Sequence, residues 1–332
     1  MSHSLTVVTG GAGFIGSNVA HSLSQAGRTV VVCDWLGTDD KWRNIQGAAL
    51  HDVVSPSALS AFLESNAGSI DAVIHMGAIS STTERDVDRL AENNIRLSLD
   101  LWRWCGEANA AFIYASSAAV YGNGSLGFDD NCDVDSLRRL RPLNAYGWSK
   151  LFVDLRIAQD VQAGSAPIPS RWAGLRFFNV YGPHEYHKGN MRSVIHQIVP
   201  NICAGDPVHL YRSHNPNYQD GGQLRDFIHV DDCVNVINWL LNNHSANGIF
   251  NVGTGKARSF HDLALAAYAA LAREPIIQYV DTPPEIRDGY QYFTEARMER
   301  LRRAGYAAPF IDLQEGIIDY IQNYLLGADP YR

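Results

Sequence analysis

A tyrosine and a lysine stand four residues apart at Tyr146 and Lys150. In a helix this spacing places both side chains on one face. A lysine ammonium beside a phenol favours the phenolate and lowers the tyrosine pKa. Such a tyrosine takes a proton from an alcohol while a hydride leaves to a redox cofactor. Ser116 and Ser117 follow an apolar run, and a serine hydroxyl there is expected to hydrogen-bond the reacting oxygen.

A glycine-rich segment near the N-terminus, TGGAGFIG at 9–16, predicts a phosphate site. Its glycines are Gly10, Gly11, Gly13 and Gly16. Glycine permits a tight turn with positive φ, lets the backbone approach a pyrophosphate, and lets the next helix pack on the strand. The segment follows a strand-like run and precedes a helix-like run, as a dinucleotide site requires. The following helix would turn its N–H groups and dipole toward the phosphates.

The residues after the second apolar run leave the cofactor type open. Asp34 would accept hydrogen bonds from a ribose, which favours NAD. Lys41 and Arg43 follow closely, and their charges suit the 2′-phosphate of NADP.

The elements that must position these residues alternate between short apolar strands and helices. Strands are predicted at 5–9, 29–33, 72–75, 111–115 and 175–179, and helices at 15–25, 57–64, 87–105, 191–204, 230–243, 259–271 and 313–326. This alternation predicts an α/β fold, a doubly wound parallel sheet of βαβ units. Composition changes after residue 180, so a nucleotide-binding domain is expected over 1–180, with segments around 226–260 returning to it. Residues 181–332 are expected to form mainly a smaller C-terminal α/β substrate lobe.

Composition excludes several classes of protein. The 332 residues include 46% hydrophobic and 19% charged residues, as in a packed globular protein. The net charge of -8 argues against a nucleic-acid partner, and no apolar run is long enough to span a membrane. Five scattered cysteines form neither a disulfide framework nor a zinc spacing, and no metal site is expected. With no signal peptide recognised, a reduced cytoplasmic protein is expected.

Three segments in this order, TGGAGFIG, ASSAAVYG (115–122) and YGWSK (146–150), resemble the extended short-chain dehydrogenase/reductases. More narrowly, they resemble the nucleotide-sugar epimerases and dehydratases. The resemblance covers nearly the whole chain, and it implies a Rossmann domain, a C-terminal sugar-nucleotide lobe, and Ser117, Tyr146 and Lys150 as the catalytic set. The 4,6-dehydratases carry an Asp-Glu pair where this chain has Ala118 and Ala119, which disfavours a dehydratase.

Three further segments are similar to the ADP-glyceromanno-heptose 6-epimerases. They are HMGAISSTTE at 75–84, FNVYGPHEYHKGNM at 178–191 and GYQYFT at 289–294. This resemblance implies inversion of C6″ of ADP-D-glycero-D-manno-heptose through a ketone, in the supply of lipopolysaccharide precursors. Tyr146 and Lys188 would then serve as two proton-transferring residues. A lysine in that role needs a lowered pKa, from burial or from Lys150 or His187 nearby. The alternative is a 4-epimerase or reductase of another nucleotide sugar.

The same resemblance implies binding residues. For the cofactor these are Gly10, Gly11, Gly13, Phe14, Ile15, Gly16, Asp34, Trp35, Lys41, Met76, Gly77, Ala78, Ile79, Ser80, Asn93, Tyr146, Lys150, Val180 and Lys188. For the substrate they are Ser80, Ser117, Asn179, Asn190, Tyr211, Arg225 and Tyr290. The subfamily uses NADP, which is therefore the expected cofactor, with NAD as the alternative.

Some features of this chain depart from the subfamily or admit two interpretations. A guanidinium at Arg225 suits a diphosphate, the alternative being a salt bridge with Asp226 or Asp232. Asn190 replaces the usual serine, and 214–224 is a longer segment whose role is open.

The expected partners are the nucleotide-sugar substrate and further copies of the chain. A homo-oligomer would pair through helices at 87–105 and 150–160. Trp102 and Trp104 lie in the first helix, although core packing explains them equally well.

Overall fold

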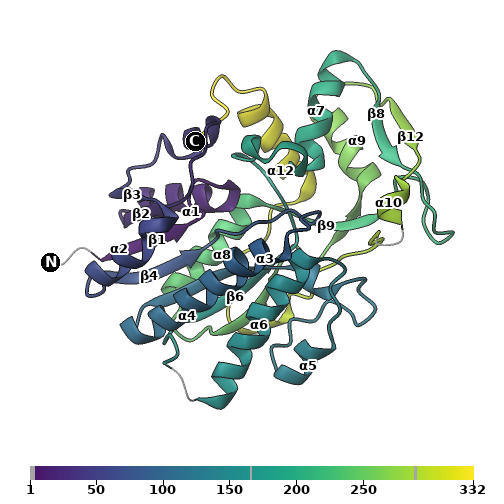
Figure 1. Ribbon diagram of the computed structural model, residues 1–332. Helices are drawn as coiled ribbons and strands as arrows, with labels where there is room; N and C mark the ends of the chain where they lie inside the picture. The colour runs from purple at the N-terminus through teal and green to yellow at the C-terminus, as the bar shows by residue number, and fades with distance from the viewer. Residues whose placement is uncertain (1–3, 165–166, 288–289) are drawn as a thin grey trace.

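A seven-stranded parallel sheet forms the centre of the protein in a computed structural model that describes residues 4–164, 167–287 and 290–332 (Figure 1). The first residues, on which the expectation of no signal peptide rests, include Met1–His3, and these residues lie outside the described ranges, as does Gly289 of the GYQYFT segment. The strand order is β10-β6-β5-β4-β1-β2-β3. The strands are β1 (Leu5–Thr9), β2 (Thr29–Cys33), β3 (Asp52–Val54), β4 (Ile70–His75), β5 (Ala111–Ser117), β6 (Trp172–Phe177) and β10 (Gly248–Val252).

The sheet is doubly wound, so the Rossmann-type fold is confirmed. Its central strands read as continuous apolar runs because both faces are covered; all five residues of β1 are buried. Helices α1 and α8 pack together on one face, and α4 and α6 pack together on the other. The helices of this part are α1 (Phe14–Gln25), α2 (Leu59–Ser65), α3 (Val87–Leu90), α4 (Leu97–Ala108), α5 (Val134–Arg139), α6 (Ala145–Ala163), α8 (Val230–Asn242) and α11 (Glu299–Arg303).

Two smaller sheets and a third apolar core lie beyond the carboxyl edge of the large sheet (Figure 1). One sheet has the order β11-β9-β7 and the other pairs β12 with β8. Their strands are β7 (Asn179–Tyr181), β8 (Val208–Tyr211), β9 (Leu224–His229), β11 (Ala257–Ser259) and β12 (Ile277–Val280). The helices around them are α7 (Val194–Ala204), α9 (Phe260–Ala270), α10 (Pro284–Arg287) and α12 (Leu313–Asp319). Between β9 and β11 the chain returns to the large sheet through α8 and β10.

Most predicted elements are present, with local differences at their ends. The helix predicted from Met191 begins instead at Val194, because the Ser193 side chain accepts the N–H of His196 and caps it. The segment predicted as one helix from Val87 is α3 and α4 joined by a π-helical turn over 91–96. The helix predicted at 259–271 is α9, whose first turn is closed by a capping box between Ser259 and Asp262.

Two findings concern the predicted oligomer interface and the question of a membrane-spanning helix. Trp102 is 2% exposed and packs edge-on against Phe112 and Trp172, so core packing explains it. Among the helices of the described ranges, none has both the length and the apolar character to cross a membrane.

Candidate active site

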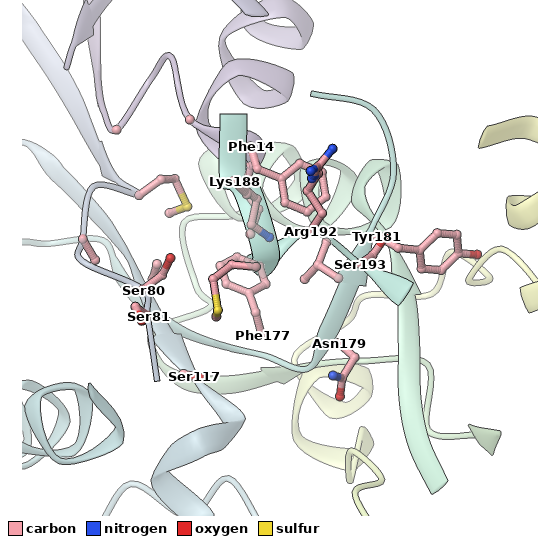
Figure 2. Close-up of a pocket in the computed structure, with 18 of the residues that line it drawn as sticks. Phe14, Ser80, Ser81, Ser117, Phe177, Asn179, Tyr181, Lys188, Arg192 and Ser193 are labelled. Carbon is pink, nitrogen blue, oxygen red and sulfur yellow. The ribbon is translucent and has the colours of Figure 1, made fainter. Parts of the chain in front are cut away.

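A cavity of about 700 Å³ opens at the carboxyl ends of β1, β4, β5 and β6 (Figure 2). Ligands collect at this edge in open α/β sheets. The cavity brings together many predicted residues from distant parts of the chain. These are Gly10, Gly13, Phe14, Ile15, Gly16, Asp34, Lys41, Met76, Gly77, Ala78, Ile79, Ser80, Ser117, Tyr146, Lys150, Asn179, Val180 and Lys188.

The glycine-rich loop has the close packing that a dinucleotide loop needs. Gly10 has φ +63°, and a Cβ there would lie 2.5 Å from Cα of Gly77. A Cβ on Gly16 would collide with the carbonyl oxygen of Gly10. Gly11 does not line the cavity; its missing side chain makes room for Val32 of β2. The loop therefore presents backbone and the start of α1 to the cavity, a cradle that fits a pyrophosphate.

Asp34 joins the glycine-rich loop to the cation that follows it. One carboxylate oxygen accepts the N–H of Ala12 at 2.9 Å, and the other accepts Nζ of Lys41 at 2.7 Å. Lys41 also donates to the carbonyl of Trp35. The indole of Trp35 is 59% exposed and does not line the cavity. The rim thus pairs a carboxylate with an ammonium group.

The loop after β4 is held by Asn94 rather than by its predicted neighbour. The amide of Asn94 accepts the N–H of Ile79 at 2.9 Å and donates to its carbonyl at 3.0 Å. It also donates to Ser149, which donates to the carbonyl of Tyr146. Asn93 instead is exposed, and its side chain donates to the carbonyl of Arg89. The π-helical turn places Asn94 inward and so ties the Ile79 loop to α6.

Ser117, Tyr146 and Lys150 all face the cavity, but Lys150 does not tune the tyrosine as expected. Burial raises the pKa of Tyr146, and a hydrogen bond with Ser117 opposes the rise. Nζ of Lys150 donates to the carbonyl of Ala115 at 2.8 Å. Burial lowers the pKa of Lys150 to about 8. Burial therefore raises the pKa of Tyr146, in the direction opposite to the lowering predicted from its spacing with Lys150.

Lys188 lies on the opposite wall from Ser117, in the short 3₁₀ segment Tyr186–Met191 (Figure 2). Its ammonium sits 4.8 Å from the ring centre of Phe14. Burial lowers the pKa of Lys188, and the charge of Glu185 opposes that shift. His187 cannot be the cation that assists, since burial lowers its own pKa to about 4 and leaves it neutral near pH 7.

A buried carboxylate closes the loop that carries Lys188. Glu185 accepts the N–H and the hydroxyl of Ser193, both at 2.5 Å. It also accepts the hydroxyl of Tyr320 at 3.0 Å. Residues 185–193 therefore form a loop joined at its base, with Lys188 near its middle.

Three predicted substrate residues, Arg225, Tyr211 and Tyr290, lie together next to the cavity. Arg225 is 9% exposed and lies 5.5 Å from the ring of Tyr290 and 5.6 Å from that of Phe260, which lines the cavity. Tyr211 packs edge-on against Tyr290. Among the described residues Arg225 forms no salt bridge, so the alternative pairing with Asp226 or Asp232 is wrong. A buried, unneutralised guanidinium favours an anionic partner.

The sequence analysis missed several cavity residues and placed others away from it. Missed lining residues include Ser81, Phe177, Arg192, Ser193 and Phe260. The SSTTE run pointed to Ser81 and the helix cap to Ser193, but no local signal marked Phe177. The predicted residues that do not line the cavity are Gly11, Trp35, Asn93, Asn190, Tyr211, Arg225 and Tyr290.

Comparison with known proteins adds to this geometry. A family model described as the NAD dependent epimerase/dehydratase family matches residues 6–253. The chain belongs to that family. It is similar to the ADP-L-glycero-D-manno-heptose-6-epimerase of Nitratidesulfovibrio vulgaris strain DP4, with 48% identity over 98% of this chain and 99% of that protein. The enzyme of the same name from Fusobacterium nucleatum is 42% identical over 98% of this chain and 100% of that protein.

A solved structure has the same fold as this chain. The ADP-L-glycero-D-manno-heptose-6-epimerase of Helicobacter pylori superposes with a TM-score of 0.78 at 28% identity, covering 96% of each chain. The family's fold and its motifs therefore extend over nearly all of this chain.

Proposed function

We propose that this protein is an isomerase that inverts C6″ of ADP-D-glycero-D-manno-heptose to ADP-L-glycero-D-manno-heptose. The substrate follows the names of the full-length relatives at 42–48% identity. The observation that carries the chemistry is that Tyr146 of α6 and Lys188 of the segment Tyr186–Met191 both line one cavity, and we assign proton transfer to these two side chains. An inversion through a planar ketone needs a proton acceptor on one face and a proton donor on the other.

Residues of the chain fit a nicotinamide dinucleotide. The cradle formed by Gly10, Gly13 and Gly16 would hold its pyrophosphate, and Asp34 and Lys41 its adenosine ribose. When bound in oxidised form, such a dinucleotide accepts and returns a hydride. Within the family's NAD dependence, NADP is our specific proposal, since Lys41 brings an ammonium to the rim beside Asp34.

The chain's own groups then divide the proton work. The Tyr146 phenol takes or gives the proton of the C6″ hydroxyl, and Ser117 hydrogen-bonds the same oxygen. Lys150 supplies a positive charge next to the end of β5, where its ammonium donates to the carbonyl of Ala115. Lys188 exchanges the proton on the other face, a role that its lowered pKa suits because the neutral amine is more accessible. No residue pair equivalent to an eliminating acid and base follows Ser117, where Ala118 and Ala119 stand.

The substrate's nucleotide end is proposed to reach the aromatic group around Arg225. The guanidinium would pair with the diphosphate, while Tyr211 and Tyr290 would bound it on one side. Asn179 at the start of β7 and Ser80 would contact the sugar from the cavity wall. Residues 181–332, apart from the returning segments around 226–260, would then form the substrate lobe.

Incubation with ADP-D-glycero-D-manno-heptose, followed at C6″ by proton NMR, tests the function. Appearance of both C6″ epimers without added cofactor would establish the reaction and retained dinucleotide. If neither NADP nor NAD supports conversion, the heptose assignment fails and other nucleotide sugars must be tried. Mass analysis of the dinucleotide released on denaturation separates NADP from NAD.

We also propose that the protein is a cytoplasmic homo-oligomer. On α6, Trp148 and Phe152 are each 41% exposed and pack edge-on against each other. Aromatic residues are enriched at protein interfaces relative to the rest of the surface. Light scattering of Trp148→Glu beside the unaltered protein tests this surface, because a charge there should shift the mass toward the monomer.

A further inference from the structure

A buried charge network lies between α6 and the strands β5 and β6, and it takes no part in the chemistry described above. Asp154 of α6 and Arg176 of β6 are both 0% exposed and form a 3.0 Å ion pair. The carboxylate of Asp154 also accepts the hydroxyls of Tyr114 and Ser116, each at 3.0 Å. Burying two full charges is costly, so the pair is weak support for stability alone.

The position of Asp154 relates it to Lys150. The two residues stand one turn apart on α6, and both are buried, so their side chains share one helix face. Lys150 donates to the carbonyl of Ala115, the residue of β5 that precedes the Asp154 partner Ser116. Asp154 therefore follows Lys150 by one helical turn and, unlike Lys150, does not line the cavity.

We propose that Asp154 is a positioning residue whose charge keeps Lys150 protonated at the carboxyl end of β5. This inference rests on the proposed function for the role of Lys150, although its first test does not. Arg176 shares the carboxylate and fixes its orientation. Ser116, the neighbour of Ser117, ties the same carboxylate to the catalytic strand end.

Apart from the Arg176 guanidinium, which is paired with Asp154, the titratable groups packed around this site include a histidine and two tyrosines. His75 of β4 is buried, and its pKa is lowered to about 3 by burial and by Lys150. Burial raises the pKa of Tyr114 well above its usual value, and burial raises that of Tyr146 on α6. The turn over 91–96 contributes the amide Asn94. Within the described parts of the chain, Asp154 is the anion that raises the pKa of Lys150.

The direction of the effect distinguishes charge from structure. Removing a carboxylate charge beside a buried ammonium should lower the pKa of Lys150 further, by about one unit or more. A mere loosening of the core would admit water and raise that pKa toward its ordinary value of 10.5. The two explanations therefore predict opposite shifts.

The chain has four lysines, Lys41, Lys150, Lys188 and Lys256, so ¹³Cε-lysine labelling gives a countable spectrum. The Lys150 signal, assigned by its loss in Lys150→Arg, would be titrated without substrate in Asp154→Asn. Tyr114→Phe is the matched control, because it removes one hydrogen bond from the carboxylate and keeps the charge. Asp154→Glu restores the charge and should restore the pKa.

A buried guanidinium left unpaired in Asp154→Asn can prevent folding. The comparison is then repeated between Arg176→Met and Arg176→Met/Asp154→Asn, in which no such charge remains. The Lys150 pKa should again be about one unit or more lower in the variant that lacks the carboxylate. In turnover with the heptose substrate, the alkaline limb of kcat should move to lower pH by the same amount.

An unchanged or raised Lys150 pKa in both comparisons overturns the inference, whether or not the protein converts the heptose. A lowered pKa in the asparagine variant, with Tyr114→Phe unshifted, supports it. Absence of heptose turnover together with a lowered pKa would count against the proposed substrate alone.

Discussion

Replacing Lys188 by methionine separates proton transfer from packing. Methionine keeps an unbranched stem beside Phe14 and removes the ammonium that lies 4.8 Å from its ring centre. The lost cation–π contact is worth about 0.5–1 kcal/mol, and relief of the buried charge offsets part of it. Loss of a positioned acid–base group costs about 10²–10⁴-fold in rate, or about 3–5 kcal/mol of transition-state stabilisation. Activity should therefore fall far more than stability.

The assay is initial-rate conversion at C6″ by NMR, paired with denaturant unfolding of the same samples. Lys256→Met is the matched control, since Lys256 is exposed and does not line the main cavity. Its kcat should equal that of the unaltered protein. If Lys188→Met retained kcat within about threefold, the assignment of Lys188 to proton transfer would be refuted. A fall in stability as large as the fall in rate would show a structural role instead.

Three further outcomes are expected. Lys41→Met should weaken NADP binding about tenfold more than NAD binding, whereas Asp34→Asn should weaken NAD binding more than NADP binding. Calorimetry with each dinucleotide measures both affinities, and equal losses would show that Lys41 and Asp34 do not select between the two cofactors. Arg225→Met should raise KM for the nucleotide sugar about 10–150-fold with kcat little changed; an effect confined to kcat would contradict diphosphate binding. Burial lowers the pKa of His75 from 6.5 to about 3, so the unfolded chain binds a proton that the folded chain refuses between those values. The free energy of unfolding should then fall by roughly 1.5 kcal/mol from this group between pH 6.5 and 5, and His75→Gln should lose that dependence in paired denaturant titrations.

The fold was accessible from the sequence because a parallel sheet buries both faces of its strands. Val7, Val31 and Val73 lie in register at the centre of the sheet, and each belongs to an apolar run that could be found by inspection. Not every strand was predicted. Asp52–Val54 and Ile277–Val280 are short and partly exposed and lack such a run, and the buried strand Gly248–Val252 of the large sheet was also missed.

The residues of the candidate site that belong to short contiguous sequence motifs could be predicted. Tyr146 with Lys150 and the glycine-rich loop fall in this class, and their residues meet in one cavity. The direction of the Tyr146 pKa was not predictable, because it depends on burial that only the folded chain shows. Asp154 and Glu185 escaped notice for a related reason: most of their partners are distant in sequence or on other elements.

The hydrogen-bonded base of the 185–193 loop has a consequence for affinity. Closing a flexible loop costs conformational entropy. Here the hydrogen bonds between the Glu185 carboxylate and Ser193 offset that entropy when the protein folds, before any ligand binds. An incoming nucleotide sugar then finds the amine of Lys188 already confined near its working position. Binding energy from the remote nucleotide end is left for orienting the sugar, rather than for ordering the protein.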